Sequence, residues 1–141
     1  MDPASTVNEF IRRVVALDLT SAGELVADDI EYDNVPVGKN FGRDAMIGFL
    51  SGMNGQFDEV EFVVHRQTAD GNTVMNERSD RFRIGDAWID LPVAGVFEVG
   101  DDGRITLWRD YFDMRTFRDQ QSAVTAADRP SPRTGSTDVE Q

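Results

Sequence analysis

One segment of the chain, 73–84, places charged side chains among apolar ones. Alternate residues of a strand share a face, and the even-numbered residues here are Val74, Asn76, Arg78, Asp80, Phe82 and Ile84. The odd-numbered residues are mostly polar, which suits contact with solvent. The even-numbered face is therefore expected to be buried, and it directs Arg78 and Asp80 at the core.

Two further segments show the same pattern. Within residues 30–36, Tyr32 and Asn34 share a face with an isoleucine. Within residues 106–112, Asp110 lies between a tryptophan and a phenylalanine on one face. Three predicted strands thus direct polar groups into apolar surroundings.

The types of these residues suggest acid–base chemistry. An unpaired buried charge is costly, so we expect Arg78, Asp80 and Asp110 to contact one another. Repulsion between the two carboxylates raises the pKa of one of them, while the arginine lowers that of the other. One protonated and one ionised carboxyl group near neutral pH supply the acid and the base that a hydrolytic reaction requires.

A purely structural interpretation of these residues is also open. Arg78 and Asp80 can form a half-buried ion pair while Asp110 caps a hairpin, because structural ion pairs also occupy inward positions. A buried residue such as Tyr32 or Asn34 often only satisfies a backbone group. The convergence of three strands favours a functional site.

Other catalytic chemistries lack the residues they need. The chain contains no cysteine, which excludes a thiol nucleophile, a zinc–cysteine site and disulfides. The single histidine, His65, has Val63 on its own face and Val64 on the other, and is interpreted as an ordinary strand residue, so neither a Ser-His-Asp triad nor a histidine metal site is expected. The glycines do not form a phosphate-binding loop.

Helices are predicted in the first part of the chain. Apolar residues recur there at the spacing of one helical face: Val7, Phe10, Ile11, Val14 and Val15. We expect helical structure over residues 1–28, including a short second helix at 21–26. A third helix is predicted over 42–53, ending where Gly52 and Gly55 break the pattern.

Strands are predicted from residue 58 onward, where β-branched and aromatic runs are separated by turn sequences. The expected strands are 60–68, 73–84, 87–99 and 104–112, with a shorter one at 30–35. Helices followed by such a meander predict an α+β domain, in which a curved antiparallel sheet wraps the N-terminal helices into a cone. We assign this domain to residues 1–120 and predict a disordered tail over 121–141.

The charge of the chain restricts its partners. Its 141 residues include 14 basic and 26 acidic side chains, a formal net charge of −12. Affinity for nucleic acid and for anionic lipid depends on clustered Lys and Arg, so neither partner is expected. No apolar run is long enough to cross a bilayer, and the N-terminal sequence lacks an export signal, so we expect a cytoplasmic protein.

Four segments carry a resemblance to a known family. They are Tyr32-Asp33-Asn34, Glu77-Arg78-Ser79-Asp80, Gly95-Val96-Phe97 and Ile105-Thr106-Leu107-Trp108-Arg109-Asp110-Tyr111-Phe112-Asp113. Over residues 5–120 the chain resembles the limonene-1,2-epoxide hydrolase family. This family belongs to the NTF2-like, cystatin-like group of cone-shaped α+β domains, which includes ketosteroid isomerases.

The resemblance implies a hydrolase that adds water to a small apolar epoxide in one step and gives a vicinal diol, without a cofactor or a metal. Asp80 matches the acid that protonates the epoxide oxygen, and Asp110 matches the base that accepts a proton from water. Arg78 matches the group that bridges both acids. Tyr32 and Asn34 match the residues that hold the water.

The resemblance also bears on the substrate and on assembly. The expected apolar walls of a substrate pocket are Leu50, Met53, Phe82, Leu91, Val93 and Phe112. The charged neighbours Asp33 and Arg81 should face outward by alternation. The chain departs from the family in two regions that shape access to the substrate pocket. Segment 83–87 is short, and an N-terminal arm before the first helix is almost absent. The identity of the epoxide therefore stays open. The resemblance implies a homodimer.

Two other functions of the same fold stay open. An isomerase or cyclase, of the ketosteroid-isomerase or polyketide-cyclase type, needs one base and an oxyanion donor, and Arg78 between two acids argues against it. A noncatalytic small-molecule-binding module keeps the apolar pocket but does not need the acid–base pair.

Overall fold

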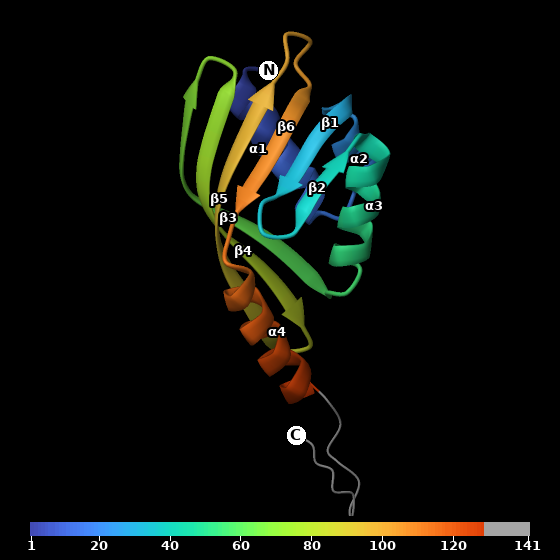
Figure 1. The fold of residues 1–141 in the computed structure, drawn as a ribbon, viewed down its shortest axis with the longest axis vertical. Coiled ribbons are helices and arrows are strands. Elements are labelled where there is room, and N and C mark those ends of the chain that lie inside the picture. The colour runs from blue at the N-terminus through green and yellow to red at the C-terminus, as the bar shows by residue number, and fades with distance from the viewer. Residues whose placement is uncertain (129–141) are drawn as a thin grey trace, which may run out of the picture.

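The fold is described here for residues 1–128 of a computed structural model. Along the chain the elements are α1 (Pro3–Val15), α2 (Leu19–Gly23), β1 (Val26–Asn34), β2 (Gly38–Phe41), α3 (Arg43–Asn54), β3 (Glu59–Asp70), β4 (Thr73–Ile84), β5 (Ala87–Val99), β6 (Ile105–Tyr111) and α4 (Met114–Asp128). The strands form one sheet in the order β2-β1-β6-β5-β4-β3 (Figure 1).

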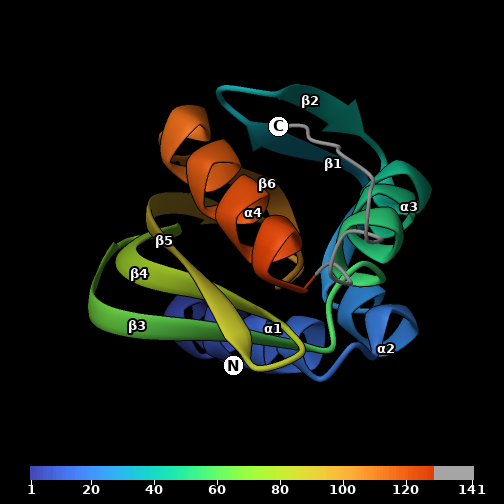
Figure 2. The same cartoon turned by 90° about the horizontal axis from the view of Figure 1, so that it is seen from below.

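The sheet is curved, and helices fill its concave side. Helix α1 packs on β3, β4 and β5, α3 packs on β1 and β2, and α4 packs on β5 and β4. Figure 2 shows these helices gathered around the space that the sheet partly encloses. The predicted α+β cone is confirmed, but the sheet is not wholly antiparallel as predicted, because β1 runs parallel to β6.

Helix α1 forms where the apolar spacing predicts it. The side chain of Asp2 caps the helix by accepting a hydrogen bond from the backbone N–H of Ser5 at 2.7 Å, and Pro3 occupies the first turn, where its missing N–H costs nothing. The residues that the helix buries are Thr6, Val7, Phe10, Ile11 and Val14. This apolar stripe fixes α1 on the concave face.

The long strands form the predicted meander, and the bounds of β4 and β5 are those predicted. The site depends on a less local feature, the parallel pairing of β1 with β6. In this register Tyr32 lies opposite Trp108, and Asn34 lies opposite Asp110. The polar residues of β1 are thereby placed beside the carboxylate of β6.

Two local predictions in the first part of the chain are wrong or incomplete. The second helix spans Leu19–Gly23 and not 21–26, and β1 begins at Val26 and not at residue 30. Strand β2, which pairs antiparallel with β1, was not predicted. It has only four residues, which are largely exposed and show no alternation of apolar and polar side chains.

The predicted disordered segment is wrong over residues 121–128, which continue α4. Phe117 and Val124, two helical turns apart, are both buried in one apolar cluster with Phe82 of β4. This packing stabilises a helix whose remaining surface is polar. The rest of the predicted tail, 129–141, lies outside the described residues. No helix within 1–128 combines the length and the apolar character needed to cross a membrane.

Candidate active site

Arg78 and Asp80 of β4 meet Asp110 of β6 in one buried cluster. Their exposed fractions are 1%, 4% and 4%. Alternation along β4 places the first two on the concave face, and the order of strands brings β6 within reach across β5. The contact predicted among these three residues is present, and neither a half-buried ion pair nor a hairpin cap describes it.

The guanidinium of Arg78 uses every N–H that it has. Nε and Nη2 donate to the two carboxylate oxygens of Asp80, both at 2.9 Å. Nη1 and Nη2 donate to Asp110 at 3.2 and 2.9 Å, and Nη1 also donates to Asn76 Oδ1 at 3.0 Å. An arginine side chain has five such donors, so the guanidinium is saturated and Arg78 is held in one position.

Close packing surrounds the guanidinium of Arg78 and Oδ1 of Asp110. A Cβ atom at Gly95 would collide with Nη1 of Arg78 and lie 2.8 Å from Oδ1 of Asp110, so glycine is required where β5 passes the cluster. The ring of Phe62 lies over the guanidinium, with Cζ 4.9 Å from its centroid. Trp108 donates from Nε1 to Oδ1 of Asp110 at 2.9 Å.

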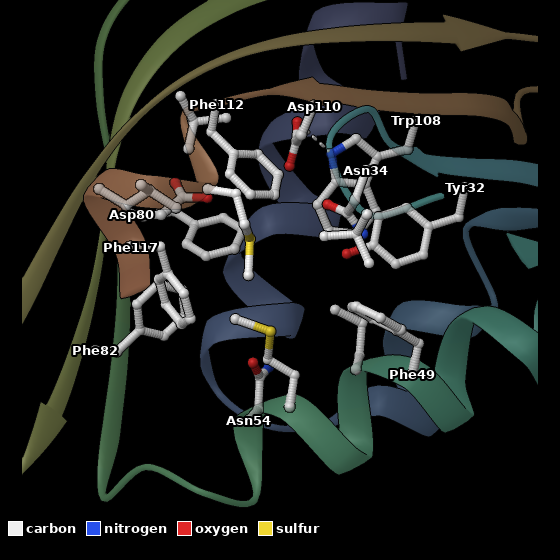
Figure 3. A pocket seen from close by; sticks show the side chains of 17 residues that line it. Tyr32, Asn34, Phe49, Asn54, Asp80, Phe82, Trp108, Asp110, Phe112 and Phe117 are labelled. Atoms are coloured by element: carbon white, nitrogen blue, oxygen red, sulfur yellow. Dashed lines mark hydrogen bonds between the residues drawn. The ribbon is translucent and has the colours of Figure 1, made fainter. Parts of the chain in front are cut away.

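The two acids face a cavity of about 160 Å³, whereas Arg78 lies behind them and does not line it. Figure 3 shows Asp80 and Asp110 at the edge of this space. A ligand in the cavity can therefore touch both carboxyl groups but not the arginine.

The protonation of the cluster follows from its burial and its excess of one negative charge. Burial raises the pKa of Asp80 from 3.8 to about 6, against the opposing effect of Arg78, and the charge of Asp110 adds to the rise. Burial alone lowers the pKa of Arg78, but Asp110 and Asp80 raise it above its ordinary value. Asp80 can therefore hold a proton near neutral pH while Arg78 stays charged.

Tyr32 and Asn34 of β1 line the same cavity beside Asp110. The ring of Tyr32 stacks on Trp108 with centroids 4.4 Å apart, and burial, together with the charge of Asp110, raises the pKa of its hydroxyl. Asn34 is buried, and its Nδ2 has no hydrogen-bond partner among residues 1–128. The amide of Asn34 and the neutral hydroxyl of Tyr32 are thus the polar groups that β1 places along the cavity next to Asp110.

The apolar walls contain all six predicted residues, Leu50, Met53, Phe82, Leu91, Val93 and Phe112. Sequence reasoning missed other lining residues: Val37, Phe49, Asn54, Phe62, Trp108, Met114 and Phe117. Phe117 could not be predicted as a lining residue, because its helix, α4, was not predicted. Asn54 had a signal, since it follows Met46 and Leu50 at intervals of four on the apolar face of α3.

The remaining charged or titratable candidates do not line the cavity. Arg81 lies on the opposite face of β4, where it pairs with Glu61, and His65 is exposed and bonds to Ser79 Oγ at 2.8 Å. Asp33 also lies away from the cavity, as alternation predicts, but only 6% of it is exposed because Arg109 pairs with it. Within 1–128, no three His, Cys, Asp or Glu side chains are grouped so as to hold a metal ion.

Comparison with known proteins gives a consistent result. The family model described as the limonene-1,2-epoxide hydrolase catalytic domain matches residues 1–122. Epoxide hydrolase EphG of Mycobacterium tuberculosis H37Rv is 40% identical over 108 residues, which are 77% of this chain and 71% of that protein.

Solved structures share the architecture. An LEH-like epoxide hydrolase from M. tuberculosis superposes with a TM-score of 0.76 at 34% identity, covering 89% of this chain and 92% of that one. A SnoaL-like protein from Shewanella denitrificans has a TM-score of 0.77 at 17% identity, over 86% and 97% of the two chains, and shows the fold alone. From the family match over most of its length, together with the 40% identity to EphG, this chain belongs to the limonene-1,2-epoxide hydrolase family.

Proposed function

We propose that this protein is an epoxide hydrolase that adds water to a small apolar epoxide in one step, giving a vicinal diol without a cofactor. The observation that carries the proposal is the pair of carboxyl groups, Asp80 and Asp110, held by one guanidinium and facing an apolar cavity. An epoxide is strained and already electrophilic. It needs only a proton for its departing oxygen and an activated water on the opposite side.

Asp80 acts as the general acid. Its raised pKa of about 6 keeps a proton on the carboxyl group at a pH where an exposed aspartate has lost it. The proton passes to the epoxide oxygen as the carbon–oxygen bond breaks. The arginine then stabilises the carboxylate that is left, because Nε and Nη2 already point at both of its oxygens.

Asp110 acts as the general base. Its Oδ1 is engaged by Trp108 and Arg78, whereas Oδ2 receives one hydrogen bond and can accept another from water. The free Nδ2 of Asn34 and the hydroxyl of Tyr32 are available to orient that water. The water oxygen forms the new bond to carbon while its proton moves to Asp110, and one proton then returns from Asp110 to Asp80.

The isomerase or cyclase alternative is less well supported. Proton abstraction beside a carbonyl needs one base and a donor aimed at the developing oxyanion. Here the strongest donor, Arg78, lies behind the acids and is saturated by Asp80, Asp110 and Asn76. A noncatalytic binding role gives no reason to bury a cluster with excess charge.

Turnover of a panel of cyclic and terminal epoxides, followed by chromatographic detection of diols, tests the proposal. We expect diol from apolar epoxides, and no change in rate when a chelator is added. The proposal is wrong if epoxides that fit the cavity bind to the protein but are not opened. From the resemblance we also propose a homodimer in the cytoplasm, and light scattering of the purified protein tests the dimer.

A further inference from the structure

Asn54, the last residue of α3, is a polar feature of the cavity outside the acid–base group. Its exposed fraction is 4%, and its side chain lines the cavity. Figure 3 shows it across this space from Asp110 and Asn34. The cavity therefore has polar groups at two separate places, joined by apolar walls.

The amide of Asn54 has no structural partner. Among the residues that the structure describes, its Nδ2 meets no acceptor. The end of α3 is completed by the backbone, since the N–H of Gly55 bonds to the carbonyl of Ser51 and the N–H of Phe57 bonds to the carbonyl of Asn54. A buried donor without a partner is unfavourable and rare, so its presence calls for an external acceptor.

The catalytic groups do not supply that acceptor. The other unpartnered amide, Asn34, lies beside Asp110, where the proposed water binds, and needs no further explanation. The rest of the cavity lining is mostly apolar and includes Phe49, Leu50 and Phe82. A buried water needs several polar partners, and this apolar lining offers few of them near Asn54.

We propose that Asn54 donates a hydrogen bond to a carbonyl oxygen carried by the substrate at the end opposite its epoxide ring. The inference rests on the proposed function and narrows the substrate class to apolar epoxides that bear one distant, neutral acceptor. A carboxylate is a poor occupant, because no Lys or Arg side chain of residues 1–128 lines the cavity and the acid cluster has an excess negative charge.

This contact makes Asn54 a specificity-determining residue. An epoxide without the carbonyl leaves the buried amide unpaired in the bound state, so the protein should discriminate against it by about tenfold or more in kcat/KM. The same contact fixes which end of the substrate enters first, and so presents the ring to Asp80 and Asp110.

The test uses matched pairs of probes. Each is a 1,2-epoxyalkane with a methyl ketone at its far end, or the analogue in which a CH₂ group replaces the ketone oxygen, in a series of increasing chain length. The ketone-to-alkene ratio of kcat/KM is measured for the parent, for Asn54→Leu and for Asn8→Leu, a control that changes an exposed asparagine of α1. We expect the parent and the control to prefer the ketone at one chain length or more, and Asn54→Leu to lose that preference while it still opens the alkene.

Stability gives an independent readout. Leucine has the same number and branching of side-chain heavy atoms and leaves no amide unpaired, so Asn54→Leu should melt at the same temperature as the parent or higher. If it does not fold, Asn54→Met serves instead. The inference is overturned if the parent shows no preference at any length, or if the variant keeps the preference. If the parent opens no probe, the proposed hydrolase activity fails, and calorimetric Kd values for the same pairs then decide the role of Asn54 by the same criteria.

Discussion

Two clusters of similar composition lie on opposite faces of the sheet. The inner cluster is Arg78 with Asp80 and Asp110, and the outer cluster is Arg109 with Asp33 and Glu31. Arg109 donates to Asp33 at 2.8 Å and to Glu31 at 2.7 Å, distances as short as those around Arg78. One arginine between two carboxylates is therefore not in itself a catalytic arrangement.

The clusters differ in their surroundings. The side chain of Arg109 is 28% exposed, whereas that of Arg78 is 0% exposed. Lys39 approaches Glu31 at 3.3 Å and balances the outer cluster, while the inner cluster keeps one excess negative charge beside an apolar cavity. Only the inner cluster therefore has both a reason to hold a proton and a substrate-sized space next to it.

The largest expected effect comes from neutralising an inner acid. Asp80→Asn and Asp110→Asn should each lower kcat by about 10³-fold, because asparagine keeps the shape of the side chain but neither gives nor takes the proton. The matched outer variant, Asp33→Asn, should stay close to the parent. Diol formation under saturating epoxide, with circular dichroism to confirm folding, measures all three. Near-normal turnover by either inner variant would remove that residue from the mechanism.

Replacing the arginine of each cluster by lysine should give the second-largest difference in kcat between the two clusters. Arg78→Lys should lower kcat by about 10²-fold, because an ammonium group cannot supply five donors in a plane and the acids lose their fixed relation. Arg109→Lys keeps a partly solvated charge next to its carboxylates, so its kcat should be little changed. Equal losses in both variants would show that the arginines stabilise the sheet in the same way.

The water-binding assignment predicts a smaller effect. Tyr32→Phe and Asn34→Ala should each reduce kcat by roughly tenfold, because a water with one remaining anchor is misplaced rather than lost. Tyr111→Phe, which changes an exposed tyrosine of β6, serves as the control and should have parent activity. If both cavity variants are fully active, neither residue holds the water.

The last prediction concerns stability and not rate. Since the pKa of Asp80 is about 6 when folded and near 3.8 when unfolded, the folded protein holds a proton that the unfolded chain has released between these values. The stabilisation of the folded protein by this bound proton is complete below about pH 4 and is lost as the pH rises through 6. Relative to Asp80→Asn, the parent should lose on the order of 2 kcal/mol of unfolding free energy over this range. Urea unfolding at several pH values measures it, and a difference that grows with pH would contradict the raised pKa.

The inner cluster was predictable from sequence because alternation is local. A period of two along β4 and β6 is enough to show that Arg78, Asp80 and Asp110 face the core. The parallel pairing of β1 with β6 joins segments distant in the chain, and nothing in either segment specifies it. The burial of Asp33 was not predictable for the same reason, because Arg109, which covers it, lies opposite it only through the pairing of β1 with β6.

The far end of the cavity was less accessible to sequence reasoning. Phe117 and Val124 lie on a helix whose polar composition suggests disorder, and it is contact with the sheet that stabilises the helix. Asn54 follows the apolar spacing of α3, but a single polar residue there has many structural explanations. Only the three-dimensional arrangement shows that its Nδ2 is unpartnered and that the residue lines the cavity.

The most direct test of the acid–base assignment is a single turnover in ¹⁸O-labelled water with enzyme in excess over the epoxide. If Asp110 activates water directly, the label enters the diol in the first turnover, because no oxygen passes through a carboxylate. An ester formed with Asp80 or Asp110 would instead deliver unlabelled oxygen to the first diol and leave the label in the protein. We predict a labelled first product and an unlabelled protein, and an unlabelled first diol would contradict the account.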